Sequence, residues 1–163
     1  LHSDPADTFR IRSTGILTHQ IRDLFWMPKD VQPEEVIYPS AVWYPDLQVM
    51  ISRETAADSR GLVLAAKAGH NSENHNHNDI GQFIILQEGQ PIIVDLGTGT
   101  YVRNTFRNET RYNFTHIGSI GHNVPLVNGI EQHFGPEHCA HNAIYSRTAE
   151  KEMLTMEIGR AHV

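Results

Sequence analysis

The sequence has little cysteine, few basic residues and no long hydrophobic run, and each shortage excludes a class of protein. Cys139 is the only cysteine among 163 residues, so an internal disulfide is excluded and the redox compartment stays open. Lys and Arg number 13 against 19 Asp and Glu, for a net charge of −6, and no basic cluster occurs. This argues against nucleic acid and anionic membrane as partners. No apolar run approaches the roughly 18–20 residues that cross a bilayer, so we expect no membrane insertion.

Histidine, in contrast, is abundant, with 11 residues. Hydrophobic residues make up 39% and charged residues 20%, which is typical of one globular domain with a sizeable core. Imidazole is the commonest metal ligand in proteins and titrates close to neutral pH. The histidines are therefore the first place to look for chemistry.

The two ends of the chain read differently from its middle. Leu17, Ile21, Leu24 and Phe25 recur at helical spacing and predict a short helix before a proline-rich linker. Residues 1–35 thus form one segment, and residues 36–156 form the main domain. The last segment, residues 157–163, resembles the translation of a sequencing-adapter oligonucleotide, and we expect it to be artefactual and to lie outside the fold.

The main domain has the pattern of antiparallel strands. Hairpins are predicted from strands 41–44 and 47–52, and from strands 83–87 and 91–95 around a turn with Gly89. Further strands are expected at 61–68, 122–128, 142–147 and 151–156, with a long polar loop at 102–121. Because the apolar runs are unbroken, the strands are expected to be covered on both faces. The fold class is therefore mainly β, an antiparallel β-sandwich.

The segment 69–95 carries the candidate chemistry. His75 and His77 alternate, and an extended backbone would send both side chains to one face. His77, Asp95 and His122 form a candidate metal site, since zinc accepts imidazole and carboxylate ligands. The alternative is a hydrogen-bonded His–Asp pair without metal. His75 is the candidate catalytic imidazole that faces the substrate.

Tyr112 lies in the long loop beside Arg111. A tyrosine near a cation can exchange a proton during catalysis, so Tyr112 is a candidate catalytic residue. The alternative is a packed aromatic ring with a satisfied hydroxyl.

These residues and their surroundings resemble the C-terminal domain of heparinase II/III-like polysaccharide lyases. The similarity lies in the motifs at 69–81, 95–101, 111–112 and 121–129. The resemblance implies a supersandwich-like β-domain that follows an α/α toroid, of which residues 1–35 would be a remnant. It further implies β-elimination of acidic, uronic-acid-containing polysaccharides or oligosaccharides (heparin-, heparan- or alginate-like).

The resemblance also implies roles for single residues. His75 matches a catalytic histidine, and Tyr112 matches a tyrosine that contacts substrate. His77, Asp95 and His122 match the ligands of a structural Zn²⁺. The remaining catalytic groups of the family belong to the toroid, so we expect this fragment to show no lyase activity alone. The family implies a bacterial cell envelope or periplasm, with the cytoplasm as the alternative.

Two other interpretations stay open. A cupin-like barrel would bind metal through His75, His77, Gln82 and His138, from a pattern that begins at Gly69. A non-catalytic carbohydrate-binding sandwich would use exposed aromatics such as Trp43, although the apolar neighbours of Trp43 favour core packing.

Overall fold

The computed structural model describes residues 37–159 except 57 and 59, together with Ile21 and Phe25. The chain divides into two compact units, Leu1–Glu35 and Val36–Val163. The helix predicted before the linker lies outside the described residues apart from those two positions. Nothing in the described residues is a helix long and apolar enough to cross a membrane.

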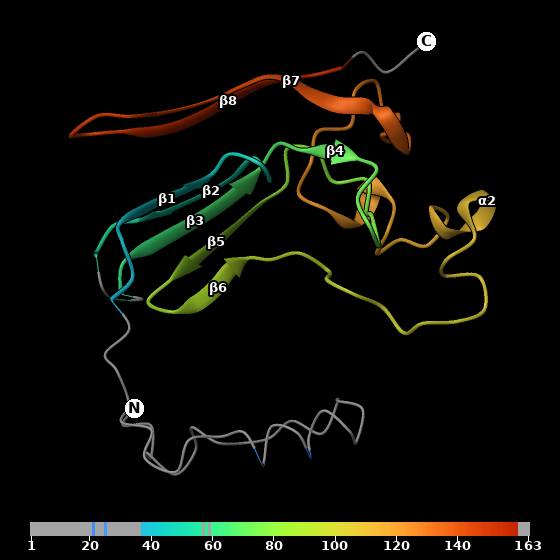
Figure 1. Ribbon diagram of the computed structural model, residues 1–163, viewed down its shortest axis with the longest axis horizontal. Helices are drawn as coiled ribbons and strands as arrows, with labels where there is room; N and C mark the ends of the chain where they lie inside the picture. Colours follow the sequence, from blue (N-terminus) through green and yellow to red (C-terminus); the bar gives the residue numbers. More distant parts are fainter. Residues whose placement is uncertain (1–20, 22–24, 26–36, 57, 59, 160–163) are drawn as a thin grey trace. The chain divides into compact units, whose positions relative to one another are not determined.

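Two antiparallel sheets form the second unit, which confirms the predicted mainly β fold (Figure 1). The five-stranded sheet has the order β1-β2-β3-β5-β6. Its strands are β1 (Ala41–Tyr44), β2 (Val49–Arg53), β3 (Leu62–Lys67), β5 (Phe83–Gln87) and β6 (Gln90–Ile93). The three-stranded sheet has the order β4-β7-β8. Its strands are β4 (His70–Asn71), β7 (Gly135–Arg147) and β8 (Glu152–Ile158).

The predicted hairpins are confirmed, and backbone conformation explains where they turn. Glu88 and Gly89 join β5 to β6 with φ of 51° and 72°. Two successive left-handed residues make the tight turn whose twist suits antiparallel strands, and Gly adopts this conformation at little cost. In the first hairpin, Gln48 has φ of 51° and its N–H donates to the Pro45 carbonyl at 3.3 Å. The turn therefore includes residue 48, and β2 begins later than predicted.

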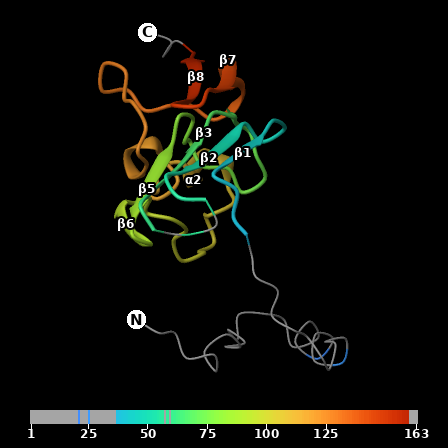
Figure 2. The same ribbon diagram turned by 90° about the vertical axis from the view of Figure 1, so that its left-hand side faces the viewer.

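The two sheets are layered, with β7 and β8 over the strands β1 to β3 (Figures 1 and 2). The Trp43 and Tyr145 rings stack with centroids 5.4 Å apart and an angle of 9°, and Arg147 donates to Ser40 Oγ at 2.8 Å. Trp43 is therefore a packing residue between the layers, as its neighbours indicated. The most buried apolar cluster consists of Ala68, Ile80 and Ala140, flanked by Ala143, Met156 and Ile158.

Among the details that differ from the sequence-based expectation, three concern the loops and the C-terminal segment. Residues 122–128 form no strand, because Pro125 lacks an N–H and the chain reverses at Asn128-Gly129, leaving only a bridge between Val127 and Ile130. The long loop contains the short helix α2 (Asn108–Arg111) and the 3₁₀ turn η2 (Ser119–Gly121).

The third difference concerns the C-terminal segment. Glu157 and Ile158, which we expected to lie outside the fold, are strand residues: they pair with His141 and Ala140 in β7. Ile158 also packs against the apolar cluster. Both residues therefore belong to the fold, Glu157 through backbone pairing and Ile158 also through its side chain.

Candidate active site

Asp95 and His122 form a pair in direct contact, and further hydrogen bonds hold the Asp95 carboxylate in place. Asp95 follows β6, and its Oδ2 lies 2.5 Å from Nδ1 of His122. The same carboxylate accepts a hydrogen bond from Gln82 Nε2 at 2.6 Å and one from the Gly97 N–H at 2.7 Å. The His122 side chain is only 1% exposed, and its Nε2 is buried without a hydrogen-bond partner. The carboxylate thus orients the ring and leaves one ring nitrogen available.

His77 lies beside this pair. Its ring centroid is 5.1 Å from that of His122 and 6.4 Å from that of His116. Burial lowers the pKa of His77 below the usual 6.5, and neighbouring His122 lowers it further, while Asp79 and Asp95 oppose the shift. The neutral imidazole that a metal ion needs is therefore the favoured form at neutral pH.

The three predicted ligands are of residue types that zinc accepts, and two of them, His77 and His122, have ring centroids 5.1 Å apart. Among the described residues, no group of three or more His, Cys, Asp or Glu side chains is arranged as a metal site, and His122 Nδ1 contacts Asp95 directly. With Zn–N distances of about 2.0–2.1 Å, two imidazoles on one tetrahedral zinc have ring centres about 5 Å apart. The ring centroids of His77 and His122 are separated by 5.1 Å, which agrees with that distance. The metal-free alternative, a hydrogen-bonded His–Asp pair, matches the Asp95–His122 contact itself.

His75 is placed differently from the sequence-based expectation. Residues 72–82 form no strand, and His75 has a left-handed φ of 59°, so the extended, alternating arrangement is wrong. The residue nevertheless lines the same small hollow as His77, with a volume of about 30 Å³. Its ring contacts Phe106 and Tyr101 at centroid distances of 5.1 and 6.5 Å. A turn, and not a strand, brings the two histidines together.

Tyr112 does not line this hollow. Its ring stacks on Phe134 with centroids 4.7 Å apart and an angle of 3°, and the guanidinium carbon of Arg111 lies 5.2 Å from its centroid. The geometry matches the packed-aromatic alternative, and a catalytic role for Tyr112 stays a prediction.

A network of buried amides holds the histidine turn. Gln132 accepts hydrogen bonds from Asn71 Nδ2 at 3.2 Å and the Ile80 N–H at 3.0 Å, and it donates to the Ile80 carbonyl at 2.8 Å. Its backbone carbonyl accepts from Asn78 Nδ2 at 2.8 Å. Asn78 receives further support from Ser119, whose hydroxyl donates to the Asn78 carbonyl at 2.8 Å. The turn is thereby tied to the segment between α2 and β7.

Several residues of the site were not predicted from the sequence. His116, Phe106 and Arg111 line the hollow with His75. Asn123 donates to Gln82 Oε1 through its N–H at 2.6 Å, and its side chain bridges the carbonyls of Phe83 and Val94. Only the sequence positions of Asn123 and Gln82 could have indicated that they belong to the site: Asn123 directly follows His122, and Gln82 directly precedes an apolar strand. No comparable feature marks His116 or Phe106.

The cupin alternative is wrong. Within the described part of the chain the strands form two sheets and no barrel, and Gln82 forms hydrogen bonds with Asp95 and Asn123. His138 lies in β7 and lines a separate cavity of about 420 Å³, where its ring is 5.5 Å from that of His133. His138 therefore belongs to another part of the molecule than His75 and His77.

Fold and site together define an antiparallel β-sandwich domain with imidazoles and a carboxylate gathered where loops leave the larger sheet. A family model described as heparinase II/III-like, C-terminal, matches residues 47–157. The chain belongs to this family, as its motifs indicated. A comparison with curated proteins gives no match.

Proposed function

We propose that the chain is the sandwich-domain part of a polysaccharide lyase that cleaves uronic-acid-containing glycans by β-elimination. Membership of the heparinase II/III-like C-terminal family supports this activity. The reaction requires neutralisation of the C5 carboxylate, a base for the C5 proton and an acid for the C4 oxygen. Heparan-like and alginate-like polymers are the substrates of this chemistry that the family resemblance implies.

The observation that carries the proposal is the placement of His75. A non-glycine residue with left-handed φ is strained, and such strain is concentrated at functional sites. Its side chain is exposed and lines a hollow shared with His77, whereas the His122 side chain beside His77 is buried. We therefore assign proton transfer with the substrate to His75 and a supporting role to the buried pair.

For the supporting role we propose a zinc ion held by His77, Asp95 and His122. The ion would cross-link three separate loops and so stabilise the turn that carries His75. The separation of the His77 and His122 ring centroids and the favoured neutral state of His77 support this assignment. A bacterial envelope location remains a proposal from family resemblance.

A panel of variants tests both assignments. We expect the chain to bind about one zinc ion, and His77→Ala and His122→Ala to lose it. His75→Ala should keep the metal, and so should the matched control His138→Ala, since His138 lies in the other cavity. Elemental analysis after dialysis measures the metal content. In a longer protein that includes the toroid, His75→Ala should abolish the ultraviolet absorbance of the unsaturated uronate product.

We expect this chain alone to give no such product, because the family places its remaining catalytic groups on the toroid. Formation of unsaturated uronate by the 163-residue chain would contradict that expectation. Loss of zinc in His138→Ala, or its retention in both His77→Ala and His122→Ala, would refute the ligand assignment.

A further inference from the structure

Arg111 is a buried cation without an acidic partner. The residue is 7% exposed, and among the described residues no carboxylate forms an ion pair with it. Its Nη2 donates to the Asn76 carbonyl at 2.6 Å, while its Nε is buried with no hydrogen-bond partner. Because a buried charge is costly unless it is paired, this guanidinium has the properties of a site for an anion.

The surroundings of Arg111 offer attraction but no compensating charge. Its guanidinium carbon lies 6.0 Å from the centroid of the Phe106 ring and 5.2 Å from that of Tyr112. Ring faces attract a cation, yet they provide no acceptor for the Nε–H of Arg111, which stays without a partner. A carboxylate is the planar anion that matches the guanidinium donors best.

The hollow beside Arg111 limits what the anion can be. Its volume of about 30 Å³ has room for a group the size of one or two waters, and not for a sugar ring. At its edge, Tyr101 is 59% and Phe106 is 51% exposed, and both contact the His75 ring. A ligand with one small anionic group and a larger body would place the anion inside and the body against these two rings.

We propose that this hollow is a carboxylate subsite, in which Arg111 pairs with the carboxylate of a uronate residue and Tyr101 and Phe106 support its sugar ring. The inference rests on the proposed function for the identity of the ligand. It adds that the sandwich domain itself neutralises a substrate carboxylate, within the hollow that His75 lines. Because Arg111 also holds the Asn76 carbonyl, occupation of the subsite acts directly on the turn that carries His75.

The side-chain Nε–H of Arg111 provides a direct test. The chain is labelled with ¹⁵N-arginine and titrated with sodium glucuronate, with glucose and with sodium chloride in separate series. We expect glucuronate alone to move the Arg111 Nε–H resonance, since Nε then gains an acceptor. Arg111→Met, which also assigns the resonance, should weaken glucuronate binding about tenfold or more, the usual effect of removing a charge-assisted hydrogen bond.

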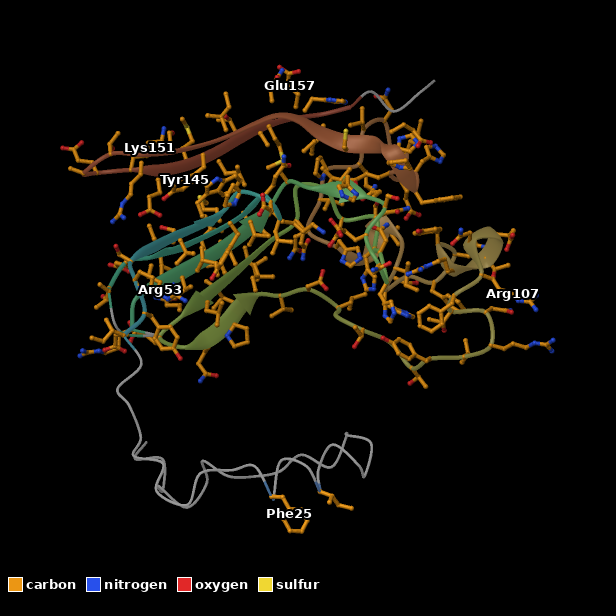
Figure 3. All side chains as sticks on the ribbon, viewed as in Figure 1. Phe25, Arg53, Arg107, Tyr145, Lys151 and Glu157 are labelled. Atoms are coloured by element: carbon orange, nitrogen blue, oxygen red, sulfur yellow. The ribbon has the colours of Figure 1, made fainter. Side chains whose placement is uncertain are left out.

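Arg107 supplies the matched control. It lies four residues earlier in the same loop, is exposed, and its side chain extends away from the ribbon (Figure 3). Arg107→Met should leave glucuronate affinity unchanged, which separates pairing at Arg111 from a general effect of net charge. Arg111→Lys should recover only part of the affinity, because an ammonium cannot pair through two planar donors.

A resonance that stays fixed throughout the glucuronate series would overturn the subsite even if Arg111→Met failed to fold, because the wild-type titration decides alone. Shifts of the Arg111 Nε–H resonance that are as large with glucose or with chloride would also overturn the subsite. Product formation in the longer protein tests the lyase proposal separately. If glucuronate binds at Arg111 but the longer protein forms no product, the subsite proposal stands and the lyase proposal is refuted. If the longer protein forms product but the Arg111 resonance stays fixed, the lyase proposal stands and the subsite proposal is refuted.

Discussion

The five-stranded sheet and the loops that carry the histidines are stabilised by different interactions. In the sheet, backbone pairing and apolar side chains dominate: Met50 is 3% exposed, and its strand pairs with neighbours on both sides. In the loops, the buried side chains are largely polar. These are Asn76, Asn78, Gln82, Thr105, Arg111 and Ser119, and the neighbouring strand β4 adds Asn71.

This difference determines how strictly each region depends on the identity of its side chains. Apolar packing is non-directional and tolerates exchange of similar side chains. A buried amide network has a defined geometry and is costly when it is incomplete. The sheet therefore supplies a platform, and the amide network fixes the backbone around His75 and His77. The two regions should respond differently to substitution.

The largest effect is expected for Gln132→Leu. The substitution leaves the N–H and carbonyl of Ile80 without their side-chain partner, and Ile80 is 2% exposed. Each buried group left unpaired costs about 1–3 kcal/mol, so the free energy of unfolding should fall by about 2–5 kcal/mol. Urea denaturation measures the loss, and hydrogen exchange should show it first in residues 72–82.

Met50→Ala and Gln87→Leu are the matched variants for this comparison. Met50→Ala should cost about 2–3 kcal/mol by cavity formation and should affect exchange in β2 and β3 first. Gln87→Leu changes an exposed glutamine at the end of β5 and should stay within about 0.5 kcal/mol. Equal exchange protection of the histidine turn in Gln132→Leu and Met50→Ala would show that the two regions are not stabilised separately.

The same difference explains which features were predictable from the sequence. Apolar runs and turn residues predicted β1, β3, β5 and β6 within a few residues, because a short apolar run and a glycine turn are local properties of the sequence. The turn at His75 was missed, since its geometry depends on Gln132 and Arg111, which are distant in sequence. Residue type predicted the proximity of Asp95 to His122, but His116 near His77 depends on loop packing that no local pattern encodes.

A second prediction concerns the connection between the two regions. Lys67 ends β3, and its Nζ lies 2.7 Å from Asp79 Oδ1 in the histidine turn. The side chains are only 26% and 16% exposed, so the pair should contribute about 1 kcal/mol, more than a typical surface pair. Lys67→Met should therefore destabilise the chain by about that amount, as measured by urea denaturation.

A double-mutant cycle with Asp79→Asn separates the pair from its surroundings. The coupling energy should decrease at high salt, because part of the pair is accessible to ions. Absence of coupling would mean that the backbone bonds between Lys67 and the segment at residues 81–82 connect the sheet to the turn without help from this ion pair.

The smallest effect should be a pH dependence that originates in the loops and not in the sheet. Burial and His122 lower the pKa of His77 below 6.5, so the unfolded chain takes up a proton at a higher pH than the folded chain. The stabilisation is therefore fully present above pH 6.5 and is lost as the pH falls through the folded-state pKa. With a chelator present to exclude metal effects, His77→Gln should flatten this decline in urea midpoint. If the urea midpoint of His77→Gln declines with the same slope as that of the wild type, other groups cause the acid sensitivity. If the wild-type midpoint rises on acidification, the pKa of His77 is raised and not lowered.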